Sequence, residues 1–379
     1  MKVAIIYYGL FDLEGKERLI GGVETYLVNL AQVCFDLGWE PILFQFAKYN
    51  FEKSINGLKV VGVPVVHLSF KQKKRCLYNT AVNYIGDNDI VIFGADHISV
   101  STKRKRCISI QHGIAWDLPV KYLSTNKFCN NKLGAKLKKI KARYDAIKRF
   151  ENCLNRVCVD YNFLNWYRTF LSDCYKGEIW VVPNFTKIAS DIEINSKPTE
   201  NGAIKIIFAR RFVEFRGVKL LAEVANKLLG KYQNIEFTFA GEGPCGNLLN
   251  KYFEKEKRVT ICKYLPEDSI RIHLKHHIAV IPSLASEGTS LSVAEAMGSG
   301  CAIVATSVGG ITNMIIDGFN GVLVAPDSGS LYDGLESVIT NKEFRQRLSK
   351  RAYETAANAF CFSRWKEKWE NVLRAVSKQ

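Results

Sequence analysis

The sequence predicts an α/β protein of two domains, each built from parallel strands that alternate with helices. At 379 residues the chain is longer than a single hydrophobic core usually grows. From Val3 onward, short apolar runs alternate with segments whose apolar residues recur at helical spacing, and this alternation starts again at Ile204. Between the two series, residues 187–202 are polar and include Pro198, as is typical of an interdomain linker.

These observations place an amino-terminal domain at residues 1–186, a linker at 187–202 and a carboxyl-terminal domain at 203–357. Short buried runs bounded by glycine, proline or polar residues are typical of parallel strands. The strands expected in the first domain are 3–8, 41–46, 89–94, 106–110, 156–160 and 180–182, and those in the second are 204–209, 235–239, 259–264, 277–281, 302–305 and 321–324.

Composition excludes several classes of protein. A 47% apolar content supports sizeable cores and argues against disorder, and no run reaches the ~18 apolar residues of a membrane-spanning helix. The start, Met1 to Gly9, lacks a small-residue cleavage site and predicts a first strand, not a signal peptide. Eleven cysteines without a Cys-x-x-Cys pair predict reduced thiols in a cytosolic protein, with no disulfide framework and no zinc site.

The formal net charge of +16 is concentrated in one segment. Residues 101–150 hold 14 Lys and Arg against only Asp117 and Asp145. Such a segment attracts anionic lipid headgroups or nucleic acid. We expect no nucleic-acid partner, because the sequence has no zinc-finger, RRM or helix-turn-helix pattern. The remaining alternatives are an inner-leaflet anionic membrane surface and a solvated basic face that only aids solubility.

The stretch from Ile281 to Gly310 combines a strand, a polar loop with a glycine, and a helix. Pro282 ends the strand, because it has no N–H to donate, and the helix is expected at Leu291–Met297. The unpaired N–H groups and the dipole of a helix amino terminus attract anions. Glu287 and Glu295 are eight residues apart, at most ~12 Å along a helix axis. This spacing suits the two ends of an extended ligand with a diphosphate between them, and carboxylates accept hydrogen bonds from sugar hydroxyls.

The same stretch resembles a known signature. Glu-Gly-Thr-Ser-Leu, followed by Glu-Ala-Met-Gly-Ser-Gly and then Val-Gly-Gly, is similar to the Glu-x7-Glu pattern of retaining GT-B glycosyltransferases, in particular glycosyltransferase family 4, the glycosyl transferases group 1. The resemblance implies two Rossmann-like, doubly wound parallel-sheet domains facing a cleft, with the helix at 358–379 packing back on the first domain. It also implies that the donor lies mainly on the second domain and that the acceptor enters through the first.

Two cationic positions and a base-binding segment in the second domain match the family pattern. Arg211 stands where the family has an Arg that holds the donor diphosphate, and Arg216, before Gly217, replaces the usual Lys of that site. An Arg keeps the positive charge but adds a planar fork of donors, so the two residues are not equivalent. The segment Lys263, Tyr264 and Leu265 stands where family members usually carry a Gly and bind the nucleobase through backbone groups.

In the first domain, Gly21 and Gly22 resemble the Gly-Gly loop that faces the donor, and His112 resembles the histidine beside the transferred sugar. In the second domain, the resemblance implies that Glu287 holds sugar hydroxyls and that Glu295 holds the ribose. The remaining donor-binding positions are Gly288, Thr289, Ser290 and Leu291, at the start of the expected helix.

The function implied is that of a retaining hexosyltransferase. It would move a hexose-type sugar from a nucleotide-sugar donor to a glycan or lipid-linked acceptor in surface polysaccharide synthesis, of the lipopolysaccharide, O-antigen or capsule type. We expect no metal and no cofactor besides the donor substrate. We also expect a cytoplasmic protein, peripheral to the cytoplasmic face of the membrane through residues 101–150. The alternatives are a nucleotide-sugar epimerase of the same fold and a non-catalytic protein that binds nucleotide sugar or nucleic acid.

Overall fold

The computed structural model describes residues 1–19, 21–114, 117, 132–170, 177–199, 202–285 and 287–379. The chain divides into two compact units. The first consists of Met1–His112, Lys127–Pro183 and Trp365–Gln379, and the second of Gly113–Asn126 and Asn184–Arg364. The part of the basic segment 101–150 at residues 115–116 and 118–131 lies outside the described residues. No helix in the described part of the chain is both long and apolar enough to cross a membrane.

The described part of the first unit holds an eight-stranded sheet in the order β3-β4-β2-β1-β5-β6-β7-β8. Its strands are β1 Lys2–Ile6, β2 Glu40–Ala47, β3 Phe51–Ile55, β4 Leu58–Pro64, β5 Ile90–Phe93, β6 Cys107–Gln111, β7 Asn155–Cys158 and β8 Ile179–Val181. Every neighbouring pair is parallel except β3 with β4. The two central strands, β1 and β5, are almost wholly buried, as expected for strands covered on both faces.

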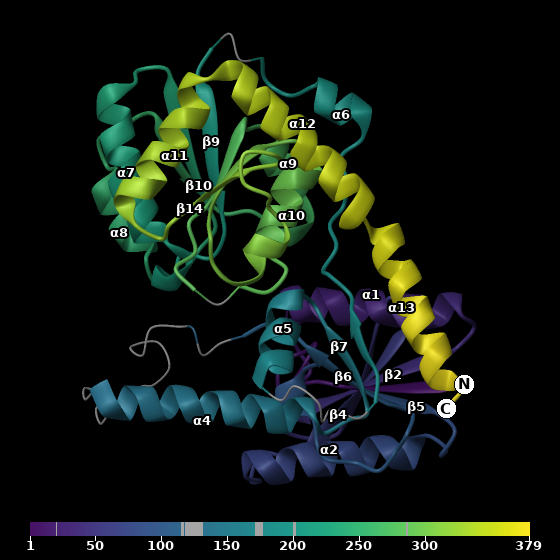
Figure 1. The fold of residues 1–379 in the computed structure, drawn as a ribbon. Helices are drawn as coiled ribbons and strands as arrows, with labels where there is room; N and C mark the ends of the chain where they lie inside the picture. The colour runs from purple at the N-terminus through teal and green to yellow at the C-terminus, as the bar shows by residue number, and fades with distance from the viewer. Residues whose placement is uncertain (20, 115–116, 118–131, 171–176, 200–201, 286) are drawn as a thin grey trace. The chain divides into compact units, whose positions relative to one another are not determined.

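Helices cover this sheet, and α1 and α2 lie on opposite faces of it (Figure 1). The helices of the first unit are α1 Gly22–Asp36, α2 Phe70–Tyr84, the 3-10 turn η1 Asp96–Ile98, α4 Lys132–Phe150, α5 Tyr161–Phe170 and α13 Phe362–Ser377, of which Phe362–Arg364 fall in the second unit. Helix α2 and strands β3 and β4 are not among the elements expected from the sequence. The β3–β4 hairpin turns at Asn56 and Gly57, which both have positive φ, and Asn-Gly is the sequence pair that such a turn favours.

Helix α13 completes the first unit although it comes last in the chain. Its apolar residues recur at helical spacing, and Trp365 and Trp369 are among the largest fully buried side chains of the protein. The Trp369 indole N–H donates to the Tyr26 hydroxyl on α1 at 2.8 Å. At the rim of this contact, Lys366 pairs with Asp36 at the end of α1.

The described part of the second unit holds a six-stranded, all-parallel sheet in the order β11-β10-β9-β12-β13-β14. Its strands are β9 Ile204–Ala209, β10 Ile235–Ala240, β11 Val259–Cys262, β12 Ile278–Ile281, β13 Ala302–Thr306 and β14 Val322–Val324. Its helices are α6 Asp191–Asn195, α7 Val218–Lys231, α8 Gly246–Tyr252, α9 Ser269–Leu274, α10 Leu291–Gly298, α11 Ser328–Thr340 and α12 Lys342–Ala359, with 3-10 turns η3 Glu214–Arg216, η4 Pro266–Asp268 and η5 Gly309–Asn313.

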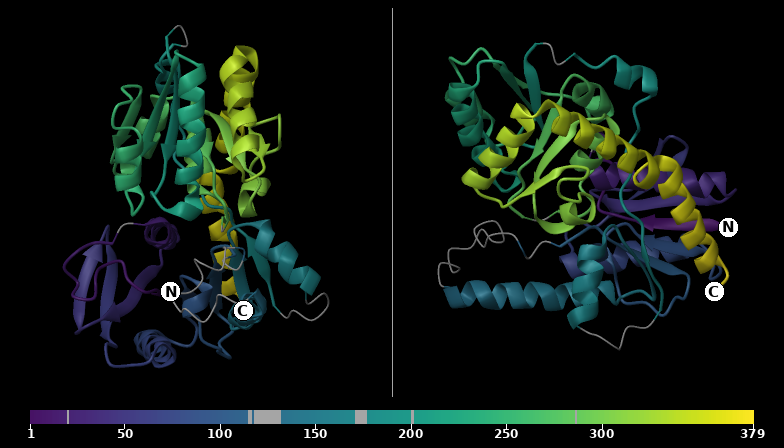
Figure 2. Two further views of the ribbon diagram at one scale, coloured as in Figure 1. Left: turned by 90° about the vertical axis from the view of Figure 1, so that its left-hand side faces the viewer. Right: turned by 45° about the horizontal axis from the view of Figure 1, so that its top comes forward.

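The two faces of this sheet bury two separate cores. Ile206 and Phe208 of β9 pack with α7 and α11, whereas the alternate residues Ile207 and Ala209 pack with α10 and α12. This follows from the strand period of two, which sends successive side chains to opposite faces. Figure 2 shows the helices of this unit on both sides of its sheet.

The unit boundaries differ in detail from those expected. The longer segment of the second unit begins at Asn184, before residue 187, and the expected linker includes the short helix α6, capped by Ser190 and Glu193. Of the final segment 358–379, residues 365–379 group with the first unit. The basic helix α4 ends at Phe150, and β7 begins at Asn155.

Replacing Trp369 by Ala should destabilise the protein by about 3–5 kcal/mol, because it leaves a large cavity between α13 and α1. Tyr26→Phe keeps the ring and removes the hydroxyl that accepts the indole bond, so it should cost only about 1 kcal/mol. Urea unfolding followed by circular dichroism measures both. An equal loss in the two variants would show that the cavity is not the main cause of the destabilisation.

Candidate active site

The candidate site of the second unit lies at the carboxyl ends of its parallel strands. Strand β9 ends at Ala209 and its neighbour β12 at Ile281, so the residues that follow them meet at one edge of the sheet. Arg210 comes directly after β9, and the loop from Ser283 to Ser290 follows β12. This arrangement places side chains that are more than 70 positions apart within hydrogen-bonding distance.

The central group of this edge is the carboxylate of Glu287, which is only 4% exposed. The Arg210 guanidinium Nη2 lies 2.6 Å from Glu287 Oε1. Arg216 forms an ion pair with the same oxygen, and the Ser283 hydroxyl donates to it. Two guanidinium groups thus face one carboxylate, and the cluster has a surplus of positive charge. A buried surplus of this sign favours a bound anion.

The protonation of the cluster follows from these contacts. Burial by itself would raise the pKa of Glu287, but Arg210 and Arg216 together bring that pKa below its ordinary value. Burial lowers the pKa of Arg216, as do the neighbouring charges of Arg210 and Arg211, and Glu287 opposes that change. The cluster is therefore composed of an ionised carboxylate between charged guanidinium groups at neutral pH.

The two adjacent arginines after β9 have different surroundings. Arg210 is 8% exposed and holds Glu287 and Ser283, whereas the side chain of Arg211 is exposed. Arg211 is among the site residues expected from the sequence, whereas Arg210 and Ser283 are not. The signal for Arg210 is its position directly after the buried strand β9, because α/β sites form at the carboxyl ends of parallel strands. Arg211 still lies near enough to Arg216 to affect its pKa.

Close backbone contacts hold this edge together. Gly217 has φ +77°, and a Cβ there would lie 1.7 Å from the Pro282 carbonyl oxygen, so only glycine fits behind Arg216. Gly309 and Gly310 also approach the loop at Glu287 closely, and the Gly310 N–H donates to the Glu287 carbonyl at 2.9 Å. These close contacts explain why the motif has glycines here, because a side chain at these positions would collide with the neighbouring backbone.

The amino terminus of α10 follows the Glu287 loop, at positions 288–291. Thr289 and Ser290 are buried, and Gly288 and Leu291 are partly buried. Ser290 is the residue before the helix, yet its hydroxyl makes no capping bond and has no hydrogen-bond partner. This hydroxyl and the first N–H groups of the helix, which have no intrahelical partners, form a site that an anion can occupy. Asn184 supports the loop by donating to the Thr289 carbonyl at 2.8 Å.

Glu295 lies one helical turn further along α10. Burial raises its pKa to about 7, and the Ser269 side chain and the charge of Arg210 act in the opposite direction. Arg210 therefore acts on both glutamates of the motif, Glu287 and Glu295. Burial and the charge of Glu295 also raise the pKa of the neighbouring Tyr264.

The predicted base-binding segment follows β11 directly. The Tyr264 hydroxyl donates to the Ala209 carbonyl at 3.3 Å, so its ring lies at the site edge. Lys263 forms an exposed ion pair with Glu242 at 2.7 Å, and Leu265 is exposed. Of the three, only Tyr264 faces the residues around Arg210.

The candidates of the first unit lie at the carboxyl edge of its own sheet. His112 follows β6, and its Nε2 lies 2.8 Å from the carbonyl oxygen of Gly94, which follows β5. Burial lowers the pKa of His112 to about 4, so the ring is neutral at pH 7. Tyr26 of α1 contacts the same ring edge to face, so the first turns of α1 lie beside His112. Gly21 and Gly22 form the start of that helix.

The second unit matches a known protein family. Residues 190–355 match the family described as glycosyl transferases group 1. The carboxyl-terminal domain belongs to this family. Members of the group use nucleotide sugars as substrates and typically need no cofactor.

Two relatives in sequence cover different parts of this chain. A human phosphatidylinositol N-acetylglucosaminyltransferase subunit is 25% identical over 343 residues, which are 84% of this chain and 66% of that protein. The lipopolysaccharide 1,2-N-acetylglucosaminetransferase of Salmonella typhimurium is 26% identical over 190 residues, 47% of this chain and 48% of that protein. The matched parts therefore span about two thirds and about half of these relatives.

A solved structure shows the same fold over the whole chain. Alr3699/HepE from Anabaena, in complex with UDP and glucose, gives a TM-score of 0.70 at 15% identity and covers 99% of this chain and 100% of that one. The fold is GT-B, with two parallel-sheet α/β domains. The family and the fold class expected from the sequence are confirmed.

The two arginines after β9 should differ in their effect on stability. Arg210→Met removes a buried partner of Glu287 and should cost about 1–3 kcal/mol; the lost ion pair is partly offset because the repulsion between Arg210 and Arg216 is relieved. Arg211→Met, at an exposed position, should change stability by less than about 0.5 kcal/mol. Thermal unfolding at pH 7 distinguishes them, and equal effects would contradict the assignment of Arg210 to the buried cluster.

Glu295 should make stability fall as the pH rises. Its pKa in the folded protein is above that of the unfolded chain, so its protonated form stabilises the fold at low pH and this contribution is lost as the pH passes through about 7. The loss should be about 1–3 kcal/mol, because a pKa displaced by one unit corresponds to about 1.4 kcal/mol. Glu295→Gln should flatten this part of the curve between pH 5 and 8. Denaturant midpoints measured across that range would show whether it does.

Proposed function

We propose that this chain is a retaining glycosyltransferase that moves a hexose-type sugar from a nucleotide-sugar donor to a glycan or lipid-linked acceptor in surface polysaccharide synthesis. The observation that carries the proposal is the surplus of positive charge around Glu287, next to the amino terminus of α10. Cations and helix-terminal N–H groups suit a diphosphate, and a carboxylate beside them suits sugar hydroxyls. The names of the human and Salmonella relatives, both N-acetylglucosamine transferases, support this choice.

In the proposed reaction, the bond between the sugar C1 and the diphosphate oxygen breaks, and a bond from C1 to an acceptor hydroxyl oxygen forms on the same face. The acceptor's proton leaves to a diphosphate oxygen or to solvent. Negative charge grows on the leaving diphosphate as the first bond breaks. Arg211, Arg216 and the first N–H groups of α10 stabilise that charge, because cations and helix-terminal N–H groups favour a developing negative charge.

Glu287 positions the sugar in this scheme. All three side-chain bonds described above use Oε1, so its second oxygen, Oε2, is the one that accepts from a sugar hydroxyl. Glu295 binds the ribose from the next turn of α10. His112 is neutral at pH 7, and its Nε2–H donates to the Gly94 carbonyl, so its Nδ1 can accept one hydrogen bond from a hydroxyl of the sugar or the acceptor. The proposed donor segment also includes Tyr264, and neither a metal ion nor an enzymatic nucleophile takes part.

The basic segment 101–150 bears on where the acceptor is found. A lipid-linked acceptor lies at a membrane surface, and the basic segment 101–150 has the charge that such a surface attracts when it contains anionic lipids. We therefore propose that the protein is peripheral to the membrane.

Calorimetry with UDP, GDP, ADP and CMP tests the donor site. We expect micromolar binding of one nucleoside diphosphate, unchanged by EDTA and at least a hundredfold weaker in the double variant Arg211→Ala/Arg216→Ala, which lacks two phosphate-binding charges. Lys251→Ala/Lys255→Ala removes the same charge from an exposed surface of the same unit and should bind as the wild type does. UDP is the first nucleotide to try, because the Anabaena protein was solved with it.

The outcomes separate the alternatives. Tight binding of none of the nucleotides would contradict the proposal. Conversion of a nucleotide sugar without any acceptor would instead favour an epimerase, and binding without turnover in the presence of acceptors would favour a non-catalytic protein.

A further inference from the structure

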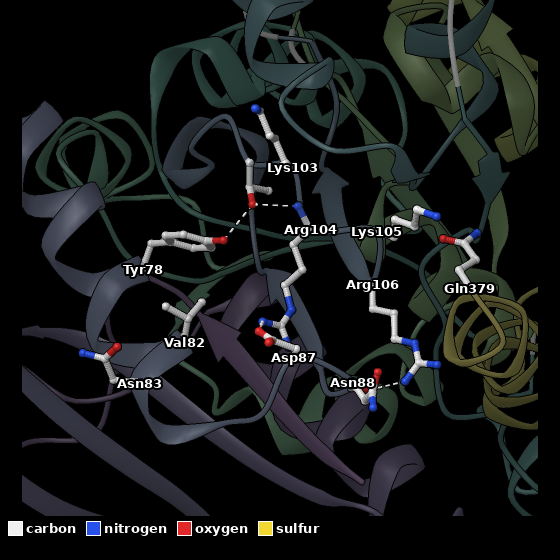
Figure 3. A pocket seen from close by; sticks show the side chains of 11 residues that line it. Tyr78, Val82, Asn83, Asp87, Asn88, Lys103, Arg104, Lys105, Arg106 and Gln379 are labelled. Carbon is white, nitrogen blue, oxygen red and sulfur yellow. Dashed lines mark hydrogen bonds and ion pairs between the residues drawn. The ribbon is translucent and has the colours of Figure 1, made fainter.

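The basic segment 101–150 separates into two parts with different surroundings. Its first part, residues 103–106, lines a hollow of about 630 Å³ (Figure 3). There Arg104 donates to the Asp89 carbonyl at 2.7 Å and Arg106 donates to the Asn88 carbonyl. These guanidinium groups bind the protein's own backbone at the start of β5. The exposed cations of this part are Lys103 and Lys105, and Lys103 points away from Asp87.

The second part is helix α4, whose charge is almost entirely positive. Among its residues from 136 to 149, Asp145 is the one acidic residue. The basic ones are Lys136, Lys138, Lys139, Lys141, Arg143, Lys148 and Arg149. In Figure 1 and in the right-hand view of Figure 2, the amino-terminal end of α4 extends away from the strands of its own sheet.

Among the described side chains of α4, those buried in a core lie at its carboxyl-terminal end. Ala146, Ile147 and Phe150 are buried, and the Phe150 ring packs against Phe163 and Tyr167 of α5, with centroids 4.8 and 4.9 Å away. Every described side chain from position 136 to 145 is exposed or partly exposed. A helix that is fixed at one end and open along the other presents a face for something outside the domain.

That open part carries three large apolar side chains on one face. Leu137 is 58% exposed, Ile140 is 57% exposed and Tyr144 is 54% exposed. Their spacing of three and four residues places them within about 60° of one another around the helix axis, so they form a continuous stripe. We call these three residues the apolar stripe. Single exposed apolar residues are common on protein surfaces, but a contiguous row on a helix marks an interaction site.

Lysines lie on both sides of the apolar stripe. By the same helical geometry, Lys136 flanks it on one side, and Lys141 and Lys148 on the other. The Lys148 ammonium lies 4.4 Å from the centre of the Tyr144 ring. Long lysine side chains can cover apolar surface with their methylene groups while the ammonium reaches a phosphate. We call Lys136, Lys141 and Lys148 the flanking lysines.

We propose that α4 docks in the plane of an anionic phospholipid surface, with the apolar stripe inserted among the lipid headgroups and acyl chain ends and the flanking lysines on lipid phosphates. The inference deepens the proposed function and rests on it, because a lipid-linked acceptor must be met at such a surface. A helix with an apolar face bordered by lysines is the arrangement that binds a membrane interface. Three side chains are far fewer than the roughly 20–30 residues a side of a stable protein interface, so charge and size both favour lipid.

Vesicle flotation with the full chain tests the proposal. We expect the wild type to float with vesicles of equal parts POPC and POPG in 0.1 M NaCl, and to bind pure POPC vesicles at least tenfold more weakly. Raising the salt to 0.5 M should weaken binding to POPG vesicles severalfold, because salt screens the lysine contacts.

Two variants separate the two components of the surface. The stripe variant, Leu137→Ser/Ile140→Ser/Tyr144→Ser, removes the apolar stripe and keeps the charge. The lysine variant, Lys136→Gln/Lys141→Gln/Lys148→Gln, removes the charge of the flanking lysines and keeps the apolar stripe. Each should lower the partition coefficient for POPG vesicles at least tenfold, and the second should also lose most of the salt dependence. Matched controls are Ile192→Ser/Ile316→Ser, whose side chains are 83% and 66% exposed, and Lys251→Gln/Lys255→Gln/Lys257→Gln, all exposed lysines of the second unit. Both should float as the wild type does.

Four results would overturn the proposal. They are a wild type that binds no vesicles, equal binding to POPC and POPG, a stripe variant that floats unchanged, and a wild-type dimer that the stripe variant converts to a monomer. Calorimetry with UDP keeps this test separate from that of the proposed function. The stripe variant should bind the nucleotide as the wild type does, because α4 contributes no residue to the donor site. Loss of flotation with unchanged nucleotide binding supports the docking surface.

Discussion

The buried contact of Arg210 and Arg216 with Glu287 is the constraint around which the second unit is arranged. Two guanidinium groups and one carboxylate are removed from water at a single point, and such charges persist in an interior only when they are paired and hydrogen-bonded. The backbone has to bring β9, the turn at Gly217 and the loop after β12 together to provide those partners. Two guanidinium groups against one carboxylate give this contact a net positive charge.

Parallel strands explain how residues so distant in the chain reach one point. All strands of the second sheet run the same way, so every segment that leaves a carboxyl end starts from the same edge. The close backbone approaches of Gly217, Gly309 and Gly310 then fix the positions of the loops at that edge. The motif therefore needs its glycines as well as its charged residues. A Cβ at these glycines would keep the backbone segments apart, and the charged side chains would not meet.

Much of this architecture could be predicted from the sequence, because buried parallel strands leave continuous apolar runs, and Ile204 to Ala209 is one of them. The Asn56-Gly57 hairpin was missed although its signal was present, because β3 is mostly exposed and has no apolar run. Arg210 was missed for a different reason. Arg210 and Arg211 are adjacent and chemically identical, and only the local backbone decides which side chain turns inward to Glu287. Likewise the charge of residues 101–150 is visible in the sequence, but whether a given cation is bound to carbonyls, as Arg104 is, depends on tertiary contacts.

The return of α13 to the first unit has a consequence for how the protein is made. Trp365 and Trp369 are buried beside Tyr26 of α1, and they are synthesised after the whole second unit. Domains generally fold in the order in which they emerge from the ribosome. Here the amino-terminal domain emerges first but completes its core last, so a nascent chain must hold an open apolar surface on α1 through the translation of some 180 further residues.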